Sequence, residues 1–290
     1  MCRRMTSNAI PRLEGWLALE KDDYLLASEK YADAVGNNPT DAVSLAHLGW
    51  ALYCQGRYNE ALRAYSESNQ YYKNDPAALS GMGLVYCALK DYRNAVEKSL
   101  EAIALAPENV YSHLYLSFIY RSKRDHHRAE KVLRAALLLE PNNGDVHSEL
   151  GAVARSNRDY VAARRHYTKA LQIKPKSAGS NLGLGLVLLD TKEYLSAREA
   201  FLRALETRPN WPCALLAFAT AETRLCHLES ASSALRKAIE INPGTIVAYR
   251  NLIRLNFRSL RWRECLAVSR QFIHHCNEGA SQAVKGAPDE

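Results

Sequence analysis

Three arginines, Arg250, Arg254 and Arg258, lie four residues apart near the end of this 290-residue chain. In a helix, residues at this spacing share one face, so the three guanidinium groups are expected to project together. Guanidinium groups form paired hydrogen bonds with carboxylates and phosphates, which favours an acidic ligand on this face. We expect an acidic segment, either of a second chain or of this chain's own end at Asp289 and Glu290. A solvated face without a ligand is the alternative interpretation.

Other residue types that perform chemistry are present, but their spacing argues against catalysis. His113 and His147 are expected to neighbour each other across two packed helices, but no third metal-ligating side chain accompanies them. The glycines within residues 179–185 follow no predicted strand, which a phosphate-binding loop requires. No P-loop, zincin or nucleophile-elbow motif occurs. We therefore expect a non-catalytic protein with no catalytic residues, no metal site and no cofactor.

These arginines and histidines belong to a pattern that repeats along the chain. Prolines recur at equal intervals, at positions 107, 141, 175, 209 and 243, and we call this interval the repeat period. Small residues recur with the same period at Gly15, Gly49, Gly83, Ser117, Gly151, Gly185 and Ala219. A fixed period of this kind is typical of repeat proteins, in which each repeat buries its apolar face against its neighbours.

Residues 144–177 show how one repeat is expected to fold. Apolar residues at helical spacing fill both halves of the repeat, and a polar stretch at 156–159 separates them. Pro175 ends the second half, because proline lacks an N–H and clashes with the preceding turn. The repeat is therefore predicted to be a pair of helices, with Gly151 leaving room for the two backbones to approach. Two later polar residues, Glu222 and Asn256, replace apolar ones, so we expect them to be partly solvated or paired with arginines.

The pattern of large residue, Leu–Gly, aromatic, Ala, aromatic, Ala and Pro resembles the tetratricopeptide repeat. The resemblance implies an all-α fold, a right-handed α-solenoid (superhelix) of stacked helix-turn-helix repeats. It covers eight repeats, at 8–41, 42–75, 76–109, 110–143, 144–177, 178–211, 212–245 and a degenerate cap at 246–279. Residues 1–7 are then a flexible N-terminal arm and residues 280–290 a disordered C-terminal tail. Pro11 predicts that the first helix begins late, with the proline in its first turn.

The resemblance also implies that the first helix of every repeat lines a concave groove. The expected groove residues are Trp16, His47, Trp50, Tyr53, Leu84, Tyr111, Tyr115, Phe118, Arg121, Arg155, Arg250, Arg254 and Arg258. Exposed apolar patches mark binding sites, and aromatic anchors dominate interface energetics, so Trp50 and Tyr115 are the expected anchors. Packing of these rings between helices is the alternative interpretation.

Composition limits the compartment and the partner. No run of apolar residues is long enough to cross a membrane, and the first residues lack the apolar region of a signal peptide. Seven scattered cysteines without C-x-x-C spacing suit a reducing compartment, so we expect a cytoplasmic protein. The net charge of +7 is concentrated in two segments, residues 121–134 and 246–275.

These features favour a scaffold or adaptor that binds a peptide or partner helix in its groove. A regulatory or substrate-recruiting subunit of an enzyme complex is the first alternative. Nucleic-acid binding through the two basic segments is the second, and it is disfavoured because aromatic and basic residues fall mostly on different repeats. Self-association of the chain stays open as a further mode of binding.

Overall fold

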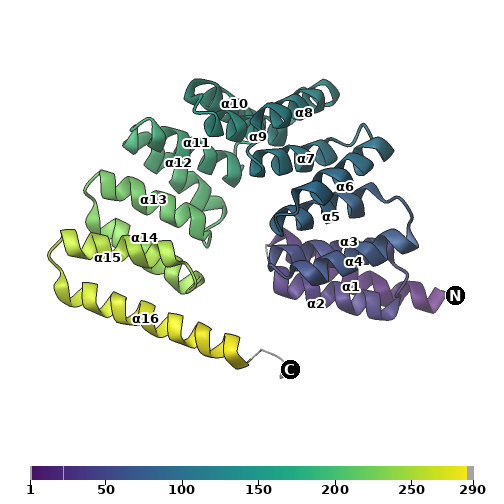
Figure 1. The fold of residues 1–290 in the computed structure, drawn as a ribbon, viewed down its shortest axis with the longest axis horizontal. Coiled ribbons are helices and arrows are strands. Elements are labelled where there is room, and N and C mark those ends of the chain that lie inside the picture. Colours follow the sequence, from purple (N-terminus) through teal and green to yellow (C-terminus); the bar gives the residue numbers. More distant parts are fainter. Residues whose placement is uncertain (1, 22, 286–290) are drawn as a thin grey trace. The chain divides into compact units, whose positions relative to one another are not determined.

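The computed structural model describes residues 2–21 and 23–285 of the chain, and the side chains of residues 9–21 and 23–275. These residues form sixteen α-helices and no strand (Figure 1). The helices are α1 (Cys2–Glu20), α2 (Tyr24–Asn37), α3 (Ala42–Cys54), α4 (Tyr58–Tyr71), α5 (Pro76–Ala88), α6 (Tyr92–Leu105), α7 (Val110–Ser122), α8 (His126–Leu139), α9 (Gly144–Ser156), α10 (Tyr160–Ile173), α11 (Ala178–Asp190), α12 (Tyr194–Thr207), α13 (Pro212–Arg224), α14 (Leu228–Ile241), α15 (Ile246–Arg258) and α16 (Trp262–Lys285). The predicted all-α class is confirmed.

Consecutive helices pack against one another as hairpins, and the same hairpin recurs along the chain. We call the odd-numbered helices A helices and the even-numbered ones B helices. From α3 onward, each A helix begins one repeat period after the previous one. The chain is therefore a solenoid of helical repeats, as predicted. It divides into two compact units, Met1–Glu149 and Leu150–Glu290, which we call the N-terminal and C-terminal units.

One backbone geometry joins the A helix to the B helix in most repeats. The residue after the A-helix cap has a positive φ at Gly56, Lys90, Arg124, Arg158, Lys192, Cys226 and Leu260. In the first of these turns, the N–H of Arg57 donates to the carbonyl of Leu52, and that of Gly56 to Tyr53. This pair of bonds satisfies carbonyls that the end of a helix leaves without partners. A left-handed residue thus reverses the chain direction once in every repeat period, although glycine fills that position in one turn only.

The side chain that follows this turn often caps the B helix. Asp91, Asp125 and Asp159 each accept a hydrogen bond from a backbone N–H in the first turn of their B helix. A cap of this kind stabilises a helix by about 1 kcal/mol. The sequence between the two helices therefore ends one helix and starts the next within a few residues.

The small residues of the A helices make room for large side chains of the B helices. A Cβ atom at Gly151 would lie 2.9 Å from the Tyr167 ring, and one at Gly183 would lie 2.3 Å from it. The Tyr167 ring thus lies against a glycine of its own repeat and a glycine of the next. The prediction that Gly151 admits the backbone of the partner helix is wrong, because the aromatic ring fills that space. The Tyr65 ring repeats the arrangement, because Gly49 and Gly81 adjoin it.

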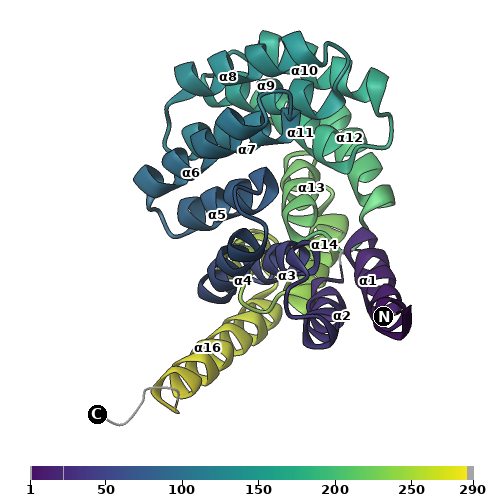
Figure 2. The same ribbon diagram turned by 90° about the vertical axis from the view of Figure 1, so that its right-hand side faces the viewer.

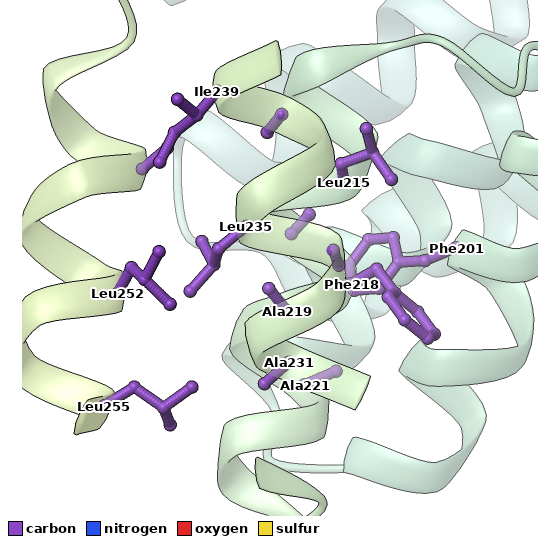
Figure 3. Packing of buried hydrophobic residues seen from close by; sticks show 14 of the residues in the cluster. Phe201, Leu215, Phe218, Ala219, Ala221, Ala231, Leu235, Ile239, Leu252 and Leu255 are labelled. Atoms are coloured by element: carbon purple, nitrogen blue, oxygen red, sulfur yellow. The ribbon is translucent and has the colours of Figure 1, made fainter. Parts of the chain in front are cut away.

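A continuous apolar core runs through the last three repeats of the C-terminal unit. Phe201, Leu215, Leu235 and Leu252 lie on four successive helices, α12 to α15, and all are at most 5% exposed. Figure 3 shows Leu235 of α14 facing Leu252 of α15. Each helix therefore contributes to a core that its neighbours on both sides share, as a repeat array requires.

Both ends of the chain differ from the sequence-based expectation. α1 begins at Cys2 and contains Pro11 in its interior, so the helix includes residues predicted as a flexible arm. Proline removes one hydrogen bond and crowds a carbonyl, which weakens a helix without forbidding it. α16 continues to Lys285, because the position one repeat period after Pro243 holds Asn277 and no proline. Residues 286–290 of the predicted tail, with Asp289 and Glu290, lie outside the described residues.

The two polar residues at apolar positions are buried. Glu222 is 1% exposed, and its Oε1 lies 2.8 Å from the Nε of Arg198 and 3.5 Å from the Nδ1 of His227. Asn256 is also 1% exposed, and its Nδ2 has no hydrogen-bond partner among the described residues. The expectation of solvation or arginine pairing therefore holds for Glu222, which pairs with Arg198. Asn256 is not partly solvated, because neighbouring repeats cover this position.

Candidate partner-binding surfaces

An aromatic cluster lies on the A helices of the N-terminal unit. The ring centroid of Trp50 in α3 lies 5.6 Å from that of Tyr53 and 6.5 Å from that of Tyr115 in α7. α5 lies between α3 and α7 and packs against both (Figure 2). Gly81 and Leu84 of α5 are both buried, and Gly81 lies against the Tyr65 ring of α4. Trp50 and Tyr115 therefore approach each other although α5 separates their helices.

The cluster is only partly covered. Trp50, Tyr53, Tyr115 and Phe118 are half-buried, and Tyr111 is 54% exposed. The cluster therefore has an inner part that packs and an outer part that solvent reaches.

Three other predicted groove residues lie in different surroundings. Trp16 in α1 is 47% exposed, whereas Leu84 is 4% exposed and so is a packing residue. The His47 ring stacks on Tyr31 with centroids 5.0 Å apart, and its Nδ1 lies 2.8 Å from the Val43 carbonyl. His47 therefore covers the Tyr31 ring at the position where Gly81 and Gly183 adjoin rings in later repeats.

Burial changes the acidity of two phenols in the cluster. It raises the pKa of Tyr53 to about 12. Burial also raises the pKa of Tyr115, and the neighbouring Tyr111 adds to the effect. Both hydroxyls are neutral at physiological pH, so the cluster presents apolar ring surface with neutral polar tips.

Two of the predicted groove arginines are held by carboxylates of the neighbouring repeat. Arg121 Nε lies 3.2 Å from Glu149 Oε2 within the N-terminal unit. Arg155 Nε lies 2.7 Å from Asp190 Oδ2 within the C-terminal unit. Arg121 also lies over the Phe118 ring, 5.3 Å from its centroid. These guanidinium groups already have anionic partners, so they join repeats and offer little to an external ligand.

The C-terminal unit contains a pocket between the A helices α13 and α15. Its volume is about 420 Å³. Its lining residues are Ala219, Thr220, Thr223, Arg224, Leu235, Asn251, Ile253, Arg254, Leu255, Phe257 and Arg258. The structure therefore brings Arg254 and Arg258 together, as predicted, but adds Arg224 and leaves Arg250 out. Arg224 lies one repeat period before Arg258, so the repeat phase carried the signal that would have placed it here.

The described residues offer no obvious site for a metal ion, because no three His, Cys, Asp or Glu side chains among them are grouped as metal ligands. The same part of the chain has no helix that is both long and apolar enough to cross a membrane.

Comparisons with known proteins agree with this geometry. Three family models described as tetratricopeptide repeat match residues 42–68, 119–178 and 154–217. The chain is a tetratricopeptide repeat protein. No curated protein matched it.

Two solved structures show how this tetratricopeptide repeat protein compares with others of its fold. A chain in the crystal structure of the APC/C hetero-tetramer Cut9–Hcn1 is 23% identical, with a TM-score of 0.65 over 81% of this chain. The match spans 46% of that longer chain. A tetratricopeptide repeat protein from Parabacteroides merdae is 15% identical, with a TM-score of 0.62 over 87% of this chain and 99% of its own. At these identities the likeness concerns the fold.

Proposed function

We propose that this tetratricopeptide repeat protein is a non-catalytic scaffold that binds an apolar or amphipathic segment of a partner protein. Tetratricopeptide repeats generally mediate protein–protein interaction. The observation that carries the proposal is the aromatic cluster of Trp50, Tyr53, Tyr111 and Tyr115, whose rings are packed on one side and reached by solvent on the other. Rigid, half-buried aromatic side chains are the residues that contribute most at protein interfaces.

In the basic segment at 121–134, three of the six basic residues lie beside carboxylates, which disfavours nucleic-acid binding by those three. Arg128 pairs with Asp125, which caps the same helix, and Arg134 pairs with Glu130 one turn earlier. Arg121 pairs with Glu149 of the next repeat. Positive charge that is already neutralised contributes little to phosphate binding. Five cysteines whose side chains are described, Cys54, Cys87, Cys213, Cys226 and Cys265, form no disulfide, which supports our proposal of a cytoplasmic location.

Quantitative affinity purification with mass spectrometry tests the scaffold proposal. We compare wild type with the double variant Trp50→Ala/Tyr115→Ala, and with the matched control Tyr71→Ala/Tyr72→Ala. The control residues are tyrosines of the same unit, 52% and 63% exposed, outside the cluster. One or more proteins, including a second copy of the chain, should be retained by wild type and the control but lost with the cluster variant.

Circular dichroism must show that both variants keep their helical content. If the cluster variant is folded and retains the same proteins in the same amounts as the control, the aromatic cluster is a packing feature and the proposal is wrong. Enzymatic activity in an assembly recovered with wild type would show that the chain serves as a recruiting subunit.

A further inference from the structure

We propose that the pocket between α13 and α15 binds a carboxylate-rich peptide segment, with Arg224, Arg254 and Arg258 holding the carboxylates and Arg250 outside the site. The inference rests on the scaffold function proposed above, but it concerns a different surface, in the C-terminal unit.

The pocket has an apolar floor and a basic rim. Ala219, Leu235 and Leu255 come from three successive helices, α13, α14 and α15, and are at most 4% exposed (Figure 3). The rim residues Arg224, Arg254 and Arg258 are all exposed. A ligand that fills this space meets apolar surface at its base and three guanidinium groups at its edge.

The rim lacks the carboxylates that accompany arginines elsewhere in the C-terminal unit. Arg155 pairs with Asp190, Arg198 with Glu222, and Arg236 with Glu264, at distances of 2.7, 2.8 and 3.3 Å. Arg164 pairs with Glu193 and Arg261 with Glu229. Within the described part of the chain, Arg224, Arg254 and Arg258 form no ion pair. Other exposed arginines of the unit, such as Arg250 and Arg270, also form no ion pair among the described residues, so what distinguishes Arg224, Arg254 and Arg258 is that they line one pocket.

A comparison of equivalent positions in successive repeats shows why the rim of the pocket lacks a carboxylate. Asp190, Arg224 and Arg258 occupy the same position in three successive repeats. In the first of these repeats the carboxylate of Asp190 accepts a hydrogen bond from Arg155. In the next two repeats an arginine replaces the aspartate. The carboxylate that Arg155 meets at position 190 therefore has no counterpart at positions 224 and 258.

The helix dipole accounts for only part of this arrangement. Arg224 and Arg258 lie in the last turns of α13 and α15, where a positive charge is favourable. Arg254 lies one turn earlier and gains less from the dipole, yet it lines the same pocket. An anionic ligand stabilises all three together.

The hydrogen-bonding groups of the pocket favour a ligand that carries hydrogen-bond acceptors. The hydroxyls of Thr220 and Thr223 donate to the carbonyls of Leu216 and Ala219 at 2.8 and 2.7 Å. The donors left for a ligand are those of the guanidinium groups, which have no acceptor atoms, together with the amide of Asn251. Carboxylates match guanidinium groups, and the apolar floor adds a requirement for an apolar side chain. The ligand is thus a short acidic segment that contains a leucine-like residue.

Helix geometry explains why Arg250 lies outside the site. Residues four apart on an α-helix are displaced by about 40° around its axis, so Arg250 and Arg258 differ by about 80°. The three arginines of α15 are thus spread over about 80° of one helix face, and Arg250 and Arg258 are about 12 Å apart along the axis. Only Arg254 and Arg258 line the pocket, together with Arg224 of α13.

Fluorescence anisotropy with synthetic peptides tests the inference on the full chain. The probe is a short fluorescein-labelled peptide with one leucine flanked by Asp and Glu, and its control carries Asn and Gln instead. The double variant Arg254→Gln/Arg258→Gln should weaken binding of the acidic peptide about tenfold or more, because each lost charged hydrogen bond contributes substantially to affinity. The matched control Arg250→Gln/Arg270→Gln removes the same charge from exposed arginines outside the pocket and should change affinity less than about twofold.

Two further variants test whether the pocket itself holds the peptide. Thr220→Trp fills the pocket but keeps every arginine, and it should abolish binding of the acidic peptide. Trp50→Ala/Tyr115→Ala leaves the pocket intact and should bind the acidic peptide like wild type, even if the aromatic cluster proves to have no partner.

Four results would overturn the inference. They are no saturable binding of the acidic peptide, equal binding of the Asn/Gln peptide, equal losses in the two double arginine variants, and unchanged binding by Thr220→Trp. Preference for inorganic phosphate or a phosphoserine peptide over the acidic peptide would also overturn it, because the site would then be one for phosphate.

Discussion

Trp50 and Tyr115 belong to A helices two repeats apart, yet their ring centroids lie 6.5 Å apart. Helix α5 lies between their two helices and packs against both. Neither residue can be moved without affecting the other, which is why the partner-binding test replaces both. The same proximity makes the cluster a single surface that spans three repeats.

Substitution of Gly183 should destabilise the protein, although alanine is the better helix former. A Cβ atom at position 183 would lie 2.3 Å from the Tyr167 ring, so Gly183→Ala should lower the free energy of unfolding by about 1–3 kcal/mol. Gly179→Ala, in the same helix, meets nothing within 4 Å and should raise it by about 0.5–1 kcal/mol. Urea unfolding measures both, and the same sign for the two variants would contradict the packing described for the ring.

The left-handed turn residues offer a route to a more stable protein. Lys90 and Lys192 have φ values of 64° and 67°, a conformation that is unfavourable for residues with a Cβ. Lys90→Gly and Lys192→Gly should each raise the free energy of unfolding by up to about 1 kcal/mol. Arg93→Gly, at an exposed position inside α6, should lower it by about 1 kcal/mol. Thermal melts of the three variants check the prediction, and a loss of stability in both turn variants would show that the lysine side chains contribute contacts of their own.

The buried Glu222 carboxyl group lies 2.8 Å from the Nε of Arg198. Arg198→Gln leaves a carboxylate that is 1% exposed without its guanidinium partner, and should destabilise the protein by about 2 kcal/mol. Arg236→Gln removes an exposed pair with Glu264 and should have an effect of less than about 1 kcal/mol. Position 188, in the same phase as Glu222, holds a buried leucine, so Arg198→Gln/Glu222→Leu should regain most of the stability. If the double variant is no more stable than Arg198→Gln, the loss arises from packing of the arginine stem.

Alkaline pH should weaken the N-terminal unit through Tyr53. Burial raises the pKa of Tyr53 from 10.0 to about 12, so the folded chain holds this proton more tightly than the unfolded chain. The resulting stabilisation is complete below pH 10 and is lost as the pH rises from about 10 to about 12. Tyr53→Phe should therefore lose less stability over this interval than wild type, whereas Tyr72→Phe, at an exposed tyrosine, should follow wild type. The test is to measure the urea midpoint of each variant at several pH values between about 10 and 12. If the midpoint falls with pH equally in Tyr53→Phe and in wild type, the loss of stability does not come from Tyr53.

The repeat period was enough to predict the helices, because proline, glycine and alanine act locally on the chain. Partners across repeats could not be predicted in this way. Arg121 and Arg155 resembled free groove residues, but their carboxylates, on Glu149 and Asp190, belong to the next repeat along the chain. The spacing of Arg250, Arg254 and Arg258 also did not show that only the last two line a pocket, because the pocket depends on α13 as well. Arg224 could be predicted only through its phase with Arg258.

The ring of Tyr167 between two glycines has a consequence for how the chain loses its structure. A side chain that belongs equally to two adjacent repeats couples their unfolding, in the way that nearest-neighbour terms govern one-dimensional arrays. In the third repeat, the position equivalent to Tyr65 and Tyr167 is Ser99, so no ring at this position couples that repeat to the next. The Ser99 hydroxyl is buried without a hydrogen-bond partner among the described residues. Amide exchange should therefore be fast at the junction between α6 and α7 as well as in the first helix, α1. The hairpins before this junction, between the third and fourth repeats, should then unfold as one group and the hairpins after it as another.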